Sequence, residues 1–173
     1  MTAALVSPGL VVVGMRGVGK STVARLLGEL LGAPWLDADA ELERRAGRTI
    51  PELFREQGEA GFRQLERTVL LELLDQPGLI LATGGGAVLH DEVRGRLKRR
   101  ATLWLTAPVA VLAARVRHTD RPSLTGLPIH LELAEVLAQR EPLYREVATW
   151  TMDTSRQSAA EVAQAAAALL RRT

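Results

Sequence analysis

Short runs of apolar residues recur along the chain and predict strands. They lie at 10–13, 35–36, 79–82, 101–105 and 149–152. Parallel neighbours need crossover connections, and each predicted strand is separated from the next by residues with helical patterning. The pattern therefore predicts a parallel sheet of five strands.

The segments between these strands carry apolar residues at helical spacing. The first helix has one apolar face, made of Val23, Leu26, Leu27, Leu30 and Leu31. The residues at 40–46 and 51–74 are also predicted to be helical, with interruptions around Gly47 and at 58–61. Further helices are predicted from the end of the glycine run at 84–86 to about residue 99, at 108–117 and at 133–144. The last helix opens at the capping box Ser158-x-x-Glu161. Helices on both faces of the sheet predict a three-layer α/β/α fold.

A glycine-rich loop joins the first strand to the first helix. Residues 14–21 read Gly-Met-Arg-Gly-Val-Gly-Lys-Ser, which is the sequence of a phosphate-binding P-loop. Its glycines let backbone N–H groups turn toward one anion, and the following helix presents its positive dipole end. Lys20 is expected to reach the β- and γ-phosphates, and Ser21 to ligate Mg²⁺. We expect ATP contacts from Gly14, Arg16, Gly17, Val18, Gly19, Lys20, Ser21 and Thr22.

Two further groups follow predicted strands. Asp37 and Asp39 follow the second strand, and Gly84, Gly85 and Gly86 follow the third. Ligands of parallel sheets bind at the carboxyl ends of the strands, so these groups are expected to meet the P-loop at one edge. The aspartates suit a cation and an acceptor hydroxyl, although Asp39 could instead only cap the next helix. The glycines allow close backbone approach to a ligand.

Composition narrows the range of possible functions. The chain has 173 residues, 47% of them hydrophobic, which suits one domain over 1–173. A net charge of +2 gives little support to nucleic-acid binding, and the absence of cysteine excludes disulfides and thiolate metal sites. No leader-like segment or long apolar span is evident, so we expect a cytoplasmic protein without membrane contact. A monomer is the simplest expectation.

The stretch at 118–130 has turn residues and little apolar periodicity, which predicts a mobile flap. Arg121 lies in it, and Arg140 lies on the helix that follows. Arg63 lies between Glu59 and Glu66 at helical spacing, so a local salt bridge would explain it. None of these arginines indicates a function by its position alone.

The motifs taken together resemble shikimate kinase. The resemblance rests on the P-loop, Asp37-Ala38-Asp39, Phe62-Arg63-x-x-Glu66, Gly84-Gly85-Gly86, Arg121-Pro122 and Arg140-Glu141-Pro142-Leu143-Tyr144, in the order found in that family and over nearly the whole chain. It implies a P-loop kinase fold with a mobile lid at about 115–130 and an acceptor-binding region at about 37–66. The implied reaction transfers phosphate from ATP, with one Mg²⁺, to the 3-hydroxyl of shikimate, giving shikimate 3-phosphate and ADP on the way to chorismate.

The resemblance also assigns roles. Asp39 would bind the acceptor hydroxyl and serve as base, and Asp37 would reach Mg²⁺. Arg63, Arg140 and Gly84 to Gly86 would hold the carboxylate and hydroxyls of shikimate, with Glu66 orienting an arginine. Lys20, Asp39 and Arg121 would form the catalytic group, with Arg121 closing over the phosphate. Arg115 and Arg156, the latter within the loop at 153–158, are the adenine candidates.

Two other interpretations of the function stay open. A related small-molecule kinase, such as gluconate kinase, would share the P-loop, and so would a non-catalytic nucleotide-binding domain of the same fold. A regulatory GTPase is excluded, because neither Lys20 nor Lys98, the only lysines, follows an asparagine as guanine selection requires. The three histidines show no metal-ligand spacing.

Overall fold

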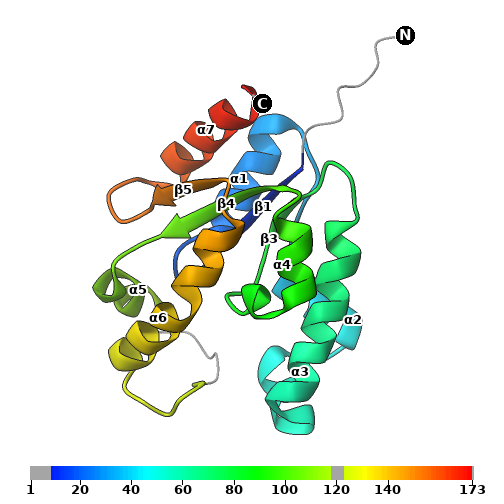
Figure 1. Ribbon diagram of the computed structural model, residues 1–173, viewed down its shortest axis with the longest axis vertical. Helices are drawn as coiled ribbons and strands as arrows, with labels where there is room; N and C mark the ends of the chain where they lie inside the picture. The colour runs from blue at the N-terminus through cyan, green and yellow to red at the C-terminus, as the bar shows by residue number, and fades with distance from the viewer. Residues whose placement is uncertain (1–8, 118–122, 173) are drawn as a thin grey trace.

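Parallel strands form one sheet in the order β2-β3-β1-β4-β5, as the computed structural model of residues 9–117 and 123–172 shows (Figure 1). The strands are β1 (Leu10–Gly14), β2 (Trp35–Asp37), β3 (Ile80–Ala82), β4 (Ala101–Thr106) and β5 (Trp150–Asp153). Val12 of β1 pairs with Ala82 of β3 on one side and Leu103 of β4 on the other. The predicted parallel sheet is confirmed, and each strand lies within about two residues of its predicted position.

Helices cover both faces of this sheet (Figure 1). On one face α1 (Lys20–Leu31) packs against α7 (Ala159–Leu170). On the other, α3 (Ile50–Leu74) contacts α4 (Asp91–Leu97), which contacts α6 (Ile129–Val147), and α6 contacts α5 (Val109–Val116). The short helix α2 (Ala38–Ala46) packs on α3, and a 3-10 turn, η1 (Ala87–Leu89), precedes α4. The predicted three-layer fold is confirmed.

Two element boundaries differ from the prediction, and one predicted interruption is found. Helix α3 is kinked at Gly58, whose φ of 70° and ψ of −179° are not helical, so the interruption expected at 58–61 is present but limited to Gly58. The helix expected to run to about residue 99 is divided into η1 and α4, which ends at Leu97. Helix α6 begins at Ile129, because Pro128 at its N-cap fixes φ near the helical value, so 129–130 are helical and not part of a flap. Residues 118–122, with Arg121, lie outside the described residues.

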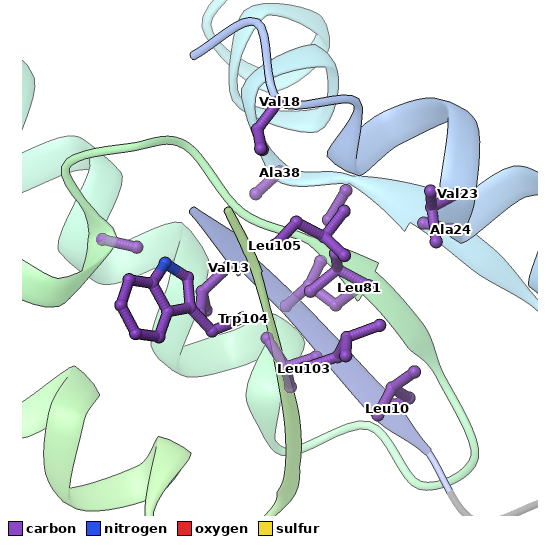
Figure 2. Packing of buried hydrophobic residues seen from close by; sticks show 14 of the residues in the cluster. Leu10, Val13, Val18, Val23, Ala24, Ala38, Leu81, Leu103, Trp104 and Leu105 are labelled. Carbon is purple, nitrogen blue, oxygen red and sulfur yellow. The ribbon is translucent and has the colours of Figure 1, made fainter. Parts of the chain in front are cut away.

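The core lies between β1 and the helix layers. Leu10, Val11, Val12 and Val13 are fully buried, as expected for a central strand covered on both faces. Alternation along β4 sends neighbouring side chains to opposite faces, and Figure 2 shows Trp104 on the opposite side of β4 from Leu105. No helix among the described residues has the length and apolar character needed to cross a membrane.

Candidate active site

The loop between β1 and α1 has the conformation of a phosphate cradle. Gly14, Gly17 and Gly19 have φ values of 145°, 80° and 100°, which residues with a Cβ rarely adopt. Gly19 caps α1 without a side-chain acceptor, so the first N–H groups of the helix face the loop. The hollow in front of it is lined by Arg16, Gly17, Gly19, Lys20, Ser21, Thr22, Arg115 and Val116.

Lys20 lies beneath this loop. Its side chain is nearly buried, and Nζ donates a hydrogen bond of 2.9 Å to the carbonyl oxygen of Met15. The ammonium is thereby held within the loop, as a phosphate-binding lysine requires. Val18 is fully buried and is not among the residues that line the hollow.

Ser21 and Asp37 meet at the end of β2. The Ser21 hydroxyl donates a hydrogen bond to Oδ2 of Asp37, while Oδ1 of Asp37 accepts from the N–H groups of Asp39 and Ala40 at 2.9 and 3.1 Å. Asp37 is therefore the N-cap of α2, which is why that helix starts at Ala38. Asp39 does not cap the helix. The two oxygen groups suit Mg²⁺, which takes few protein ligands beside substrate phosphates. Among the described residues, no group of three or more acidic, histidine or cysteine side chains is arranged to hold a metal ion by itself.

A second hollow, which we call the acceptor pocket, opens beside the P-loop. Its cavity volume is about 80 Å³. Its wall combines apolar side chains with a few convergent polar groups, as small-molecule sites do. The apolar part of its wall comes mainly from α3 and α6, and the polar part from four different segments. The lining residues are Met15, Arg16, Asp39, Ile50, Phe54, Phe62, Arg63, Glu66, Gly84, Gly85, Gly86, Leu124, Glu132, Leu133, Val136 and Arg140. All six residues predicted to bind substrate are among them.

The glycines after β3 are needed for close packing in this pocket. A Cβ on Gly84 would lie 2.7 Å from Oδ1 of Asp39, and one on Gly86 would lie 2.0 Å from Nη1 of Arg63. Both side chains therefore pack directly against the main chain of the loop. Asp39 is 9% exposed and faces the pocket from the first turn of α2.

Arg63 is held in place by carboxylates on its own helix. Its Nη1 donates to Oε2 of Glu66 at 2.8 Å, and its Nε lies 3.5 Å from Oε1 of Glu59. Nε2 of His90 lies 3.1 Å from the same Glu66 oxygen. Burial raises the pKa of Glu66, but the hydrogen bonds from His90 and Arg63 outweigh it and bring the pKa below its usual value. The predicted orienting role of Glu66 is consistent with this geometry, whereas the contact with His90 was not expected.

Arg140 approaches the pocket from α6. It is 8% exposed, and among the described residues no carboxylate lies within ion-pair distance of its guanidinium. One turn further on, the buried Tyr144 donates to the carbonyl oxygen of Gly85 at 2.6 Å. Burial raises the pKa of Tyr144 to about 12, so the hydroxyl keeps its proton. A buried guanidinium without an acidic partner suits an anionic ligand.

Arg16 lies in the walls of both hollows. We expected it in the ATP site as part of the P-loop, and its guanidinium also faces the acceptor pocket, 3.3 Å from Oε2 of Glu132. Glu132 was missed by the sequence analysis. The available signal was its spacing, because Glu132, Val136 and Arg140 are four residues apart and so share one face of α6.

Of the two arginines that were predicted to contact adenine, only Arg115 lines the phosphate hollow. Arg115 donates to the carbonyl oxygen of Gly17 at 3.3 Å and to Thr154 at 3.1 and 2.9 Å, so it joins the P-loop to the loop after β5. It lines the phosphate hollow, whereas Arg156 lies in the exposed turn after Thr154 and does not. Arg121 lies outside the described residues.

Comparisons with known proteins agree with one another. A sequence model of the shikimate kinase family matches residues 16–171. The shikimate kinase of Nitrosomonas europaea is 45% identical over 155 residues, which are 88% of this chain and 74% of that protein. A shikimate kinase from Acinetobacter baumannii, solved in complex with shikimate, superposes with a TM-score of 0.91 at 42% identity and covers 95% of this chain and 93% of its own. A gluconokinase from Sinorhizobium meliloti, at 23% identity, has a TM-score of 0.63 over 96% of this chain and 93% of its own, a likeness of fold alone. The chain belongs to the shikimate kinase family, the enzymes that transfer a phosphoryl group from ATP to shikimate.

Proposed function

We propose that this chain transfers the γ-phosphoryl group of ATP to the 3-hydroxyl of shikimate and releases ADP and shikimate 3-phosphate. The observation that carries the proposal is the shared wall of the two hollows. The phosphate hollow follows β1, the acceptor pocket follows the neighbouring β3, and Arg16 lines both. A donor phosphate and an acceptor hydroxyl bound in them would be adjacent.

The acceptor pocket has the chemistry that a polyhydroxylated monocarboxylate needs. Arg140 lacks an acidic partner among the described residues and is free to pair with a carboxylate, and Arg63 is aimed into the pocket by Glu66. The backbone at Gly84 to Gly86 offers polar groups at close range to ligand hydroxyls. The apolar side chains of Phe54 and Phe62 cover the remaining wall. This part of the proposal assigns the acceptor site to residues of about 37–66 together with the glycine loop and α6.

Asp39 acts on the acceptor hydroxyl. As a carboxylate in the wall of the pocket it accepts a hydrogen bond from the 3-hydroxyl, orients its oxygen toward the γ-phosphate and takes its proton as the new bond to phosphorus forms. Phosphoryl transfer needs mainly positioning and charge neutralisation, which we assign to Lys20, the P-loop N–H groups and Arg121. Arg115 and Arg156 are the proposed adenine contacts.

Ser21 and Asp37 fit a nucleotide-bound Mg²⁺, because their oxygen atoms already converge at the edge of the phosphate hollow. When bound, the ion neutralises charge on the β- and γ-phosphates. A monomer as the working unit stays a prediction. A cytoplasmic location stays a prediction.

The test is ADP release from Mg-ATP with shikimate, gluconate or no acceptor. We expect turnover with shikimate only. Asp39→Asn should lower kcat by about 100-fold or more, and Arg140→Ala should mainly raise the KM for shikimate. Both variants should bind ATP as the unchanged protein does. Turnover with gluconate would point instead to a related small-molecule kinase. ATP binding without acceptor-dependent turnover would point to a non-catalytic nucleotide-binding domain.

A further inference from the structure

Glu132 is a buried carboxylate in the wall of the acceptor pocket. It is 2% exposed, although glutamate is seldom buried to this extent. Oε2 faces Nη2 of Arg16 at 3.3 Å and accepts a hydrogen bond from the Ser123 hydroxyl at 3.1 Å, while Oε1 accepts from the N–H of Leu124 at 2.5 Å. Both carboxylate oxygens of Glu132 therefore accept hydrogen bonds.

Arg16 is the only charged partner of this carboxylate among the described residues. Its side chain is 15% exposed and lines the phosphate hollow as well as the acceptor pocket. Arg16 thus lies at the boundary between the two hollows. The contact of 3.3 Å is longer than a tight charge-assisted hydrogen bond, which leaves Arg16 within reach of a competing anion.

The charges of the described lining of the acceptor pocket balance when Glu132 is counted. Its lining contains three arginines and three carboxylates, and the carboxylates Glu66 and Glu132 each hold one arginine. The acceptor brings a single negative charge, and Arg140 is available for it. The phosphorylated product adds up to two further negative charges, for which Arg16 is the remaining guanidinium in the described wall.

We propose that Glu132 is a positioning residue that competes with the phosphoryl group for Arg16 and so limits the affinity of the site for its phosphorylated product. Arg16 contacts the phosphoryl group while it crosses between the hollows and returns to Glu132 as the product leaves. The proposal rests on the proposed function. It differs from a purely structural role, in which Glu132 only anchors Ser123 and Leu124.

Glu132→Gln separates these two roles. The amide oxygen still accepts hydrogen bonds from Leu124 or Ser123, but it no longer neutralises Arg16. We expect the Kd of shikimate 3-phosphate, measured by calorimetry with ADP present, to fall about tenfold, while the KM for shikimate changes by less than about threefold. In Arg16→Gln the product should bind more weakly, and in the double variant Glu132→Gln should have no further effect.

Glu135→Gln is the matched control, because Glu135 is exposed on the same helix and should leave product affinity unchanged. Unchanged or weaker product binding by folded Glu132→Gln, with normal shikimate turnover by the parent protein, overturns the inference. If the parent protein does not phosphorylate shikimate, the proposed function fails. In that case titration of the ADP-bound protein with inorganic phosphate decides the inference, since Glu132→Gln must bind phosphate more tightly.

Discussion

Replacing Gly86 by alanine tests the acceptor pocket without removing any polar group. The backbone accepts alanine, since φ is −87°. The added Cβ would lie 2.0 Å from Nη1 and 2.7 Å from Cζ of Arg63. An ordinary contact begins at 3.4 Å, so the guanidinium must withdraw by about 1.4 Å, the difference from 2.0 Å. That movement is enough to break the 2.8 Å hydrogen bond to Glu66.

The expected rise in the KM for shikimate follows from the contact that Arg63 is proposed to make with the substrate carboxylate. Losing one well-placed charge-assisted hydrogen bond to the substrate carboxylate costs about 1.5–3 kcal/mol. At about 1.4 kcal/mol per factor of ten, the KM for shikimate should rise by about 10- to 150-fold. The KM for Mg-ATP should stay within about twofold, because Arg63 does not line the phosphate hollow.

The assay is steady-state ADP release with either substrate varied. Gly95→Ala is the matched control, because nothing lies within 4 Å of a Cβ at Gly95 in α4 and alanine favours the helix. On an Arg63→Ala background, Gly86→Ala should add little to the loss. A normal KM for shikimate in Gly86→Ala refutes the reasoning. So does an equal rise in this KM when Gly86→Ala is added to the parent protein and to Arg63→Ala.

Three further predictions follow from single contacts. Tyr144→Phe leaves the buried carbonyl of Gly85 without its donor and should lower the free energy of unfolding in urea by about 1–3 kcal/mol; an unchanged midpoint contradicts this. The pKa of Glu66 is lower in the folded protein than its ordinary 4.5, so its stabilising contribution is complete above about pH 4.5 and is lost as the pH falls through the folded value. Glu66→Gln should therefore flatten the fall in unfolding free energy on acidification, and an equally steep fall speaks against it. Asp37→Asn keeps an oxygen to cap α2, so stability should change by less than about 1 kcal/mol, while the Mg²⁺ concentration for half-maximal turnover should rise several-fold; unchanged Mg²⁺ dependence would remove Asp37 from the metal site.

The sequence predicted the sheet and the residues that follow its strands well, because both depend on local patterns. The buried run at 10–13 and the glycine-rich loop after it specify a strand, a turn and a helix within a few residues. The position of Asp39 and the three glycines at one edge follows from the parallel topology. Element ends were less predictable, as Ile129 shows, because polar turn residues precede it.

The contacts between distant segments could not be predicted. Arg16 and Glu132 are 116 residues apart, and only the approach of α6 to the P-loop makes them partners. In the same way, His90 meets Glu66 because η1 packs against α3. A histidine or glutamate of this kind has no local signal beyond its place on a helix face.

The pairing of β1 with β3 sets the distance between the starts of the two binding loops. Thr83, which opens the glycine loop, donates its backbone N–H to the carbonyl oxygen of Val12 at 3.1 Å, just before the P-loop begins. Both binding loops thus start from adjacent main chains about 4.8 Å apart. No side-chain substitution can alter that spacing. Changes in α2, α3 and α6 can therefore exchange one acceptor for another while the distance over which the phosphoryl group travels stays the same.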